Sequence, residues 1–261
     1  MTTFNVDFSS LTTAAIKDFL NSAEKLTPEE IKALRNDRRG SVQKLIYSFL
    51  RQRERERQTK ERLHRMASKE AFIQSKGYNF VAGVDEAGRG PLAGPVVAAA
   101  VILDAPWDSC WEGINDSKQL SPLKREKLYQ VIICQAKAWA VGVVNAALID
   151  RINIYRASLE AMKLAVLKLW PQPRFVLCDG FLIPGLELPQ EAVQGGDSSC
   201  LSIAAASIVA KVTRDRLMQA YEKVYPGYGF AQNKGYPTPE HKRALQTLGL
   251  SPIHRRTFKC F

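Results

Sequence analysis

Residues 81–90 read VAGVDEAGRG, an apolar run that ends in two adjacent carboxylates and then a Gly-Arg-Gly segment. An apolar run of this length between turn residues predicts a buried strand. Asp85 and Glu86 at its end are costly to desolvate unless a positive group meets them, and a metal ion is the simplest such group. The glycines on either side of Arg89 let a phosphate or sugar approach the backbone closely. The alternative is that the two acids cap a following helix and the glycines only turn the chain.

Strands and helices alternate from Tyr78 onward, which is the order expected of an α/β domain. A later apolar strand again ends in a carboxylate, Asp179. Ligands gather at strand ends in open α/β sheets, so Asp179 would reach the same place as Asp85 if the two strands are neighbours. The predicted strands are 80–85, 95–103, 139–144 and 174–179, and the predicted helices are 121–136, 154–170 and 201–224.

A further acid, Asp197, follows two glycines and precedes the helix predicted over 201–224. Gly-Asp-Ser before a helix is also an ordinary N-terminal cap. If Asp85, Glu86, Asp179 and Asp197 gather without a cation, they repel one another and some of their pKa values rise. Oxygen ligands without His or Cys favour two Mg²⁺ or Mn²⁺ ions. Such a pair activates water and stabilises the leaving oxygen of a phosphodiester.

Composition indicates the class of binding partner and the cellular compartment. A chain of 261 residues with 46% hydrophobic residues can bury a sizeable core, and its net charge of +11 favours a polyanionic partner. Five cysteines without a C-x-x-C pair indicate neither a disulfide framework nor a zinc site. With no signal peptide or apolar run long enough to span a membrane, we expect a cytoplasmic protein without a membrane partner.

Other hydrolytic chemistries lack their residues here. A metal-free ribonuclease needs acid and base groups near neutral pKa, usually His, but the three histidines are not next to the acidic stretches. The sequence contains neither a Walker phosphate loop nor a Gly-x-Ser-x-Gly nucleophile elbow.

Residues 1–77 have a helical pattern without strand signals. A capping box at Thr27 predicts a short helix to about Asn36, and a second helix is expected from Gly40. The stretch 51–69 is rich in Arg and Lys, and two interpretations stay open: a solvated helix with ion pairs, or a surface that contacts phosphates. Ser68 is expected to cap a last short helix that ends at Gly77.

Residues 83–97, GVDEAGRGPLAGPVV, resemble the signature of the ribonuclease HII family. Further blocks similar to that family follow in order at 116–121, 179–180, 196–198, 203–215, 228–230, 234–238 and 254–258. The resemblance implies an α/β, RNase H-like fold with a mixed five-stranded sheet flanked by helices and further helices at the C-terminus. It also implies a catalytic domain over 78–261, preceded by an all-helical, basic extension over 1–77.

The resemblance further implies an endonuclease that uses Mn²⁺ or Mg²⁺ and leaves 3′-hydroxyl and 5′-phosphate ends. Its substrates would be RNA/DNA hybrids and duplex DNA with an embedded ribonucleotide, cut on the 5′ side, with roles in ribonucleotide removal and RNA primer processing. We expect a monomer without an obligate protein partner. The nearest rival is ribonuclease HIII, for which a strand-rich N-terminal domain and a different residue at Arg89 are expected. A rival of another class is a non-catalytic nucleic-acid-binding protein.

Roles carry over residue by residue. Asp85, Glu86, Asp179 and Asp197 would bind metal, and Gly88, Arg89 and Gly90 would sense the ribose 2′-hydroxyl, the one group that distinguishes RNA from DNA at a site. Tyr236 would pack on the neighbouring deoxyribose, or would simply pack against its turn. Lys118 and Lys211 are candidates for phosphate contacts, or exposed side chains without a defined partner. Asp215 is interpreted as an ion-pair partner, and His254 as either near the site or structural.

Overall fold

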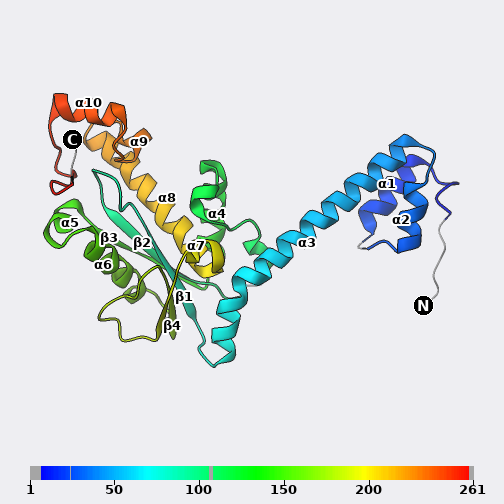
Figure 1. Cartoon of the computed structure of the whole chain (residues 1–261), viewed down its shortest axis with the longest axis horizontal. Helices are drawn as coiled ribbons and strands as arrows, with labels where there is room; N and C mark the ends of the chain where they lie inside the picture. The colour runs from blue at the N-terminus through cyan, green and yellow to red at the C-terminus, as the bar shows by residue number, and fades with distance from the viewer. Residues whose placement is uncertain (1–6, 24, 106–107, 259–261) are drawn as a thin grey trace. The chain divides into compact units, whose positions relative to one another are not determined.

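The computed structural model describes residues 7–23, 25–105 and 108–258 (Figure 1). It contains two compact units, residues 1–61 and 62–261. The boundary between them falls inside one helix, α3 (Gly40–Ser75), so the last turns of that helix belong to the second unit. The division of the chain into domains after residue 77 stays a prediction. Among the described residues, no helix combines the length and apolar character needed to span a membrane.

The first unit is helical, as its pattern indicates. It contains α1 (Thr13–Ser22), α2 (Pro28–Arg35) and the first part of α3. The capping box at α2 is confirmed, because Thr27 Oγ1 accepts from the backbone N–H of Glu30 while the Glu30 carboxylate accepts from the N–H of Thr27. A small apolar core holds the three helices together, formed by Phe8, Ile16, Leu20, Leu34, Val42 and Ile46.

The short helix expected from Ser68 is wrong, because α3 continues through that position to Ser75. Between residues 51 and 69 the chain has no Gly or Pro to interrupt a helix, and the Ser68 hydroxyl donates to the carbonyl of Arg65 within it. Arg57 forms ion pairs with Glu54 and Glu61, as expected of a solvated helix face. Contact of this stretch with phosphates stays a prediction.

The second unit is built on a mixed five-stranded sheet, which confirms the predicted fold class. The strand order is β3-β2-β1-β4-β5, in which β1 pairs antiparallel with β2 and parallel with β4. The pairs β2–β3 and β4–β5 are antiparallel and parallel, respectively. The strands are β1 (Val81–Ala87), β2 (Val96–Ile102), β3 (Ala138–Val144), β4 (Phe175–Asp179) and β5 (Gln190–Val193).

Two long helices cover opposite faces of this sheet, α6 (Ile154–Leu167) and α8 (Leu201–Val224) (Figure 1). Along β2, Ala98 and Ala100 belong to the core beneath α6, while Ala99 and Val101 belong to the core beneath α8. This alternation of small apolar residues is what a strand buried on both faces requires. The helix expected to end at 170 ends at residue 167 instead, four residues before Pro171, which cannot continue a helix.

Further elements complete the unit. The C-terminal helices that the resemblance implied are present. The remaining elements are η1 (Ser109–Trp111), η2 (Ser117–Gln119), α4 (Pro122–Gln135), α5 (Ala146–Ile152), α7 (Gly196–Ser199), α9 (Phe230–Asn233) and α10 (Pro239–Leu248).

Candidate active site

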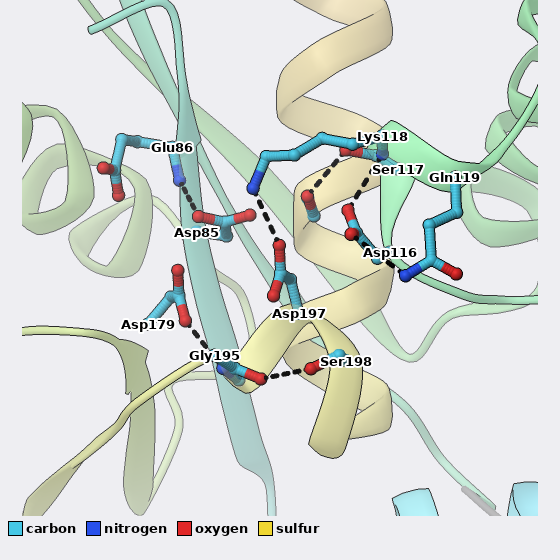
Figure 2. Close-up of polar contacts among 12 residues, drawn as sticks. Asp85, Glu86, Asp116, Ser117, Lys118, Gln119, Asp179, Gly195, Asp197 and Ser198 are labelled. Atoms are coloured by element: carbon cyan, nitrogen blue, oxygen red, sulfur yellow. Dashed lines mark hydrogen bonds and ion pairs between the residues drawn. The ribbon is translucent and has the colours of Figure 1, made fainter.

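The first two acids lie within β1, and no helix follows them directly to be capped. Strand β4 is the parallel neighbour of β1, with Val84 opposite Cys178. Asp85 and Asp179 are each the next residue, so adjacent strands bring them to the same edge, as the sequence predicted. In Figure 2 the carboxylates of Asp85 and Asp179 point toward one space, with Glu86 beside them.

The short helix α7 brings Asp197 to this space. The backbone N–H of Gly196 donates to Asp179 Oδ1 at 2.7 Å, which ties α7 to the end of β4. Asp197 Oδ2 lies 3.0 Å from Nζ of Lys118 (Figure 2). Asp197 lies in the first turn of α7, and the N-terminus of α8 has no side-chain cap of its own from Cys200. The alternative that Asp197 is only a cap for the long helix is therefore not what its contacts show.

Turn η2 delivers Lys118 to the carboxylates. The Asp116 side chain accepts from the backbone N–H of Lys118 at 2.9 Å and so fixes the turn. The hydroxyls of Ser117 and Ser207 lie 2.9 Å apart, which joins the turn to α8. Lys118 thus has a defined partner in Asp197 rather than a free side chain.

The negative charge of the four carboxylates exceeds the positive charge of Arg89 and Lys118, the basic residues that contact them. Burial raises the pKa of Asp85 well above its usual value, and the charges of Glu86 and Asp179 raise it further. Burial also raises the pKa of Glu86, against the opposing effect of Arg89, whose Nη1 lies 3.3 Å from Glu86 Oε1. Burial likewise raises the pKa of Asp179. A buried group of carboxylates in this state gains stability from a cation.

The donor set fits a hard divalent ion, since all four side chains offer carboxylate oxygens. In the conformations described, no three His, Cys, Asp or Glu side chains within the described ranges are gathered around one ion position. The four carboxylates nevertheless have the ligand chemistry of a magnesium or manganese site, and Lys118 is the positive group that touches Asp197.

Most of the predicted site residues line one cavity of about 370 Å³. Asp197 is outside this lining and reaches it through Lys118. The lining residues that the sequence singled out are Asp85, Glu86, Gly88, Arg89, Gly90, Lys118, Asp179, Lys211 and Tyr236.

Comparison with known proteins matches both parts of the chain. Residues 82–261 match the family model for ribonuclease HII, and residues 12–73 match the model for the ribonuclease HII N-terminal domain. The chain belongs to the ribonuclease HII family. It is therefore an enzyme, an endonuclease of the ribonuclease H class, and this class acts on RNA/DNA hybrids.

Individual relatives agree. The chain is 45% identical to ribonuclease HII from Bacillus subtilis strain 168 over 96% of this chain and 97% of the relative. The crystal structure of ribonuclease H2 from Pyrococcus horikoshii OT3 superimposes with a TM-score of 0.61 at 32% identity, over 70% of this chain and 95% of that one. A structure of Bst-RNase HIII in complex with Mn²⁺ is 21% identical with a TM-score of 0.55, over 76% of this chain and 70% of that one, and shares the fold. The rival assignment to ribonuclease HIII is thus not supported.

Sequence reasoning did not single out two buried residues that support the cavity wall. They are Arg214 and Arg255, which are 1% and 0% exposed. Both donate to backbone carbonyls of the segment that follows β1, and Arg214 donates to one further carbonyl outside it. Arg255 donates to Gly88, Arg89 and Gly94, and Arg214 donates to Ala93, Pro95 and Lys234. Both arginines fall in blocks similar to the family, but nothing in their local sequence distinguishes them from surface arginines.

The roles that the sequence suggested for three further residues can be compared with the structure. Asp215 is confirmed as an ion-pair partner, because its Oδ1 lies 2.7 Å from Nζ of Lys211. His254 is structural: it is 3% exposed, and its Nε2 lies 3.0 Å from Nε2 of His241. Tyr236 is 43% exposed and lies in the cavity wall, while its backbone carbonyl accepts from His241 Nδ1.

Proposed function

We propose that this protein cuts the RNA strand of RNA/DNA hybrids and incises duplex DNA on the 5′ side of an embedded ribonucleotide. The observation that supports it is the shared cavity, in which the acids of β1 and β4 lie beside the Gly88–Gly90 segment and Tyr236. One pocket thereby holds carboxylates suited to phosphodiester hydrolysis and a backbone segment open to a ribose.

The four carboxylates Asp85, Glu86, Asp179 and Asp197 would hold two divalent ions, Mn²⁺ or Mg²⁺. When bound, these ions supply an activated water and stabilise the leaving 3′-oxygen, which yields 3′-hydroxyl and 5′-phosphate ends. The protein itself holds the acids close together, and the charge of the bound ions would favour their ionised form against the effect of burial. Lys118, 79% exposed at its side chain, would turn from Asp197 to a substrate phosphate.

Recognition of the ribose is assigned to the segment after β1. Among the residues that the structure describes, only the Tyr236 ring, at 3.8 Å, lies near the position that a Cβ on Gly90 would occupy. A sugar can therefore approach this backbone, and the 2′-hydroxyl is the group that marks a ribonucleotide. Arg89 would contribute its charge next to Glu86, and Tyr236 would pack on the deoxyribose that follows the ribonucleotide. Lys211, held by Asp215, would contact a phosphate further along the strand.

The proposal includes the cellular roles of this activity. Ribonucleotide removal from DNA and processing of RNA primers would take place in the cytoplasm, with the protein acting as a monomer.

Product mapping on a duplex with one ribonucleotide tests the proposal. With Mn²⁺ or Mg²⁺ we expect a single cut 5′ of the ribonucleotide and a product with a 3′-hydroxyl, shown by extension with a polymerase. An all-DNA duplex should stay intact. Cutting on the 3′ side, a 2′,3′-cyclic phosphate end, or cleavage in excess EDTA would contradict it.

A further inference from the structure

A buried glutamate lies behind the site, on the part of α3 that belongs to the second unit. Glu70 is 2% exposed, and its Oε1 accepts both the backbone N–H of Ser202, at 2.8 Å, and the Ser202 hydroxyl, at 2.6 Å. Its other oxygen, Oε2, is buried without a hydrogen-bond partner among the described residues. Burial raises the pKa of Glu70. A carboxyl buried at this cost needs a reason, because an apolar residue would fill the space more favourably.

Ser202 lies in the first turn of α8, where backbone N–H groups have no partner within the helix. The N-cap residue of α8 is Cys200, whose side chain accepts no hydrogen bond from that turn. Glu70 therefore caps α8 from a different helix, across 132 positions of sequence.

The turn that Glu70 holds sits between two of the site carboxylates. On one side, Cys200 donates from its N–H to the carbonyl of Gly196, so the first turn of α8 continues directly from α7, which carries Asp197. On the other side, Ser202 presses on Gly83 of β1, two residues before Asp85. A Cβ added at Gly83 would lie 2.2 Å from the Ser202 carbonyl carbon and 2.5 Å from its hydroxyl. Ser202 therefore adjoins both the helix that carries Asp197 and the strand that carries Asp85.

We propose that Glu70 is a positioning residue for the metal site: by holding Ser202 at two points it fixes α7 and so the place of Asp197 relative to Asp85. The inference rests on the proposed role of these carboxylates as metal ligands. Glu70 touches no substrate and acts only through Ser202. It makes the last turns of α3 a structural support of the catalytic centre.

Three full-length variants test the proposal, with Mn²⁺ binding by the protein alone, measured calorimetrically, as the main readout. Glu70→Ala removes both hydrogen bonds and should weaken Mn²⁺ binding about tenfold, as loss of groups that orient metal ligands does. Glu70→Gln keeps an oxygen at the same place and should bind Mn²⁺ like the wild type. Glu61→Ala is the matched control: it also removes a carboxylate from α3, but Glu61 is exposed and pairs with Arg57, so both hydrogen bonds to Ser202 stay intact.

Cleavage is measured alongside. In Glu70→Ala we expect a lower kcat at subsaturating Mn²⁺ with an unchanged KM for the duplex, because the substrate surface is untouched. The proposal is overturned if Glu70→Ala binds Mn²⁺ as the wild type does, if Glu70→Gln is as weak as Glu70→Ala, or if Glu61→Ala is equally weak. If Glu70→Ala does not fold, Ser202→Ala takes its place. A weakening of Mn²⁺ binding smaller than tenfold in Ser202→Ala supports the proposal, and unchanged Mn²⁺ binding overturns it. A wild-type protein that neither binds Mn²⁺ nor cleaves would instead refute the proposed function itself.

Discussion

Nη2 of Arg255 donates a hydrogen bond to the carbonyl oxygen of Gly88 at 2.6 Å, across 167 positions of sequence. Nη1 of the same side chain donates to Arg89, and Nε donates to Gly94. One planar guanidinium therefore fixes two carbonyls of the segment assigned to ribose recognition and a third at Gly94. Because Gly88 has a φ of 97°, a backbone conformation open mainly to glycine, its orientation depends on such outside support.

Replacing Arg255 by Lys should therefore disturb both stability and recognition. A lysine can satisfy only part of this set, and each buried carbonyl left without a donor costs about 1–3 kcal/mol. We expect urea denaturation to show a loss of at least about 2 kcal/mol. The catalytic efficiency kcat/KM on a single-ribonucleotide duplex should fall at least about tenfold, since small displacements of groups that position the substrate slow the reaction strongly. Arg256→Lys is the control, because Arg256 is exposed next to it; equal behaviour of the two variants would contradict the assignment.

The contrast between Arg255 and Asp85 shows what the sequence could predict. The acids were found because an apolar run that ends in carboxylates is a local pattern, and the repeat of that pattern at Asp179 needs only strand adjacency to place both acids together. Arg255 and Arg214 satisfy carbonyls far away in the chain, and their own neighbours in sequence carry no trace of this. A buried arginine whose hydrogen bonds go to distant backbone carbonyls is visible only once the fold is known.

Glu70 was missed for the same reason. In sequence it directly follows the charged stretch 51–69, where an exposed side chain is the ordinary expectation. Its burial follows from the continuation of α3 to Ser75, and the break expected at Ser68 concealed that continuation. Propensity predicts that a helix forms but not which face a neighbouring element covers.

Asp179→Asn tests the metal site by ligand removal. The amide keeps an oxygen to accept from Gly196, so the fold should survive, and removing a charge that faces Asp85 should leave the metal-free protein at least as stable. Wild type should gain about 2.7 kcal/mol at a Mn²⁺ concentration 100 times the Kd. The variant should gain little and cleave at most weakly.

Thermal unfolding with Mn²⁺ and with EDTA measures this difference. Asp104→Asn is the matched control, because Asp104 is an exposed aspartate paired with Lys137 outside the cavity. It should keep the full response to Mn²⁺. A normal metal response and normal cleavage in Asp179→Asn would remove Asp179 from the ligand set.

Tyr236 should matter most where RNA meets DNA. Loss of its ring in Tyr236→Ala should lower kcat/KM on a single-ribonucleotide duplex about tenfold, which is the scale of one stacking contact. The loss on a continuous RNA/DNA hybrid should be smaller, because there each ribose is followed by another. Tyr236→Phe keeps the ring and should stay near the wild-type rate. Equal rates for Tyr236→Ala and wild type on both substrates would leave Tyr236 with packing alone.

The buried pair of His241 and His254 makes the stability of the second unit depend on pH. The backbone N–H of Ser251 donates to His254 Nδ1 at 2.9 Å, so in this tautomer Nε2 carries the proton toward His241. Burial, and to a smaller extent the neighbouring His241, lowers the pKa of His254 from 6.5 to about 4. Between these values the unfolded chain binds a proton that the folded protein does not, so stability rises with pH through this window and falls as pH drops.

The expected loss from pH 7 to pH 4 through His254 is about 3 kcal/mol, measured by urea denaturation at a series of pH values. His254→Asn keeps an oxygen that can accept from Ser251 but cannot titrate, so this part of the pH dependence should disappear even if the variant is less stable overall. His64→Asn is the control, because His64 is exposed on α3 and should leave the dependence unchanged. If His254→Asn retained the full slope between pH 6.5 and 4, the pH dependence would have to come from other groups, and the neutral histidine pair would not be its source.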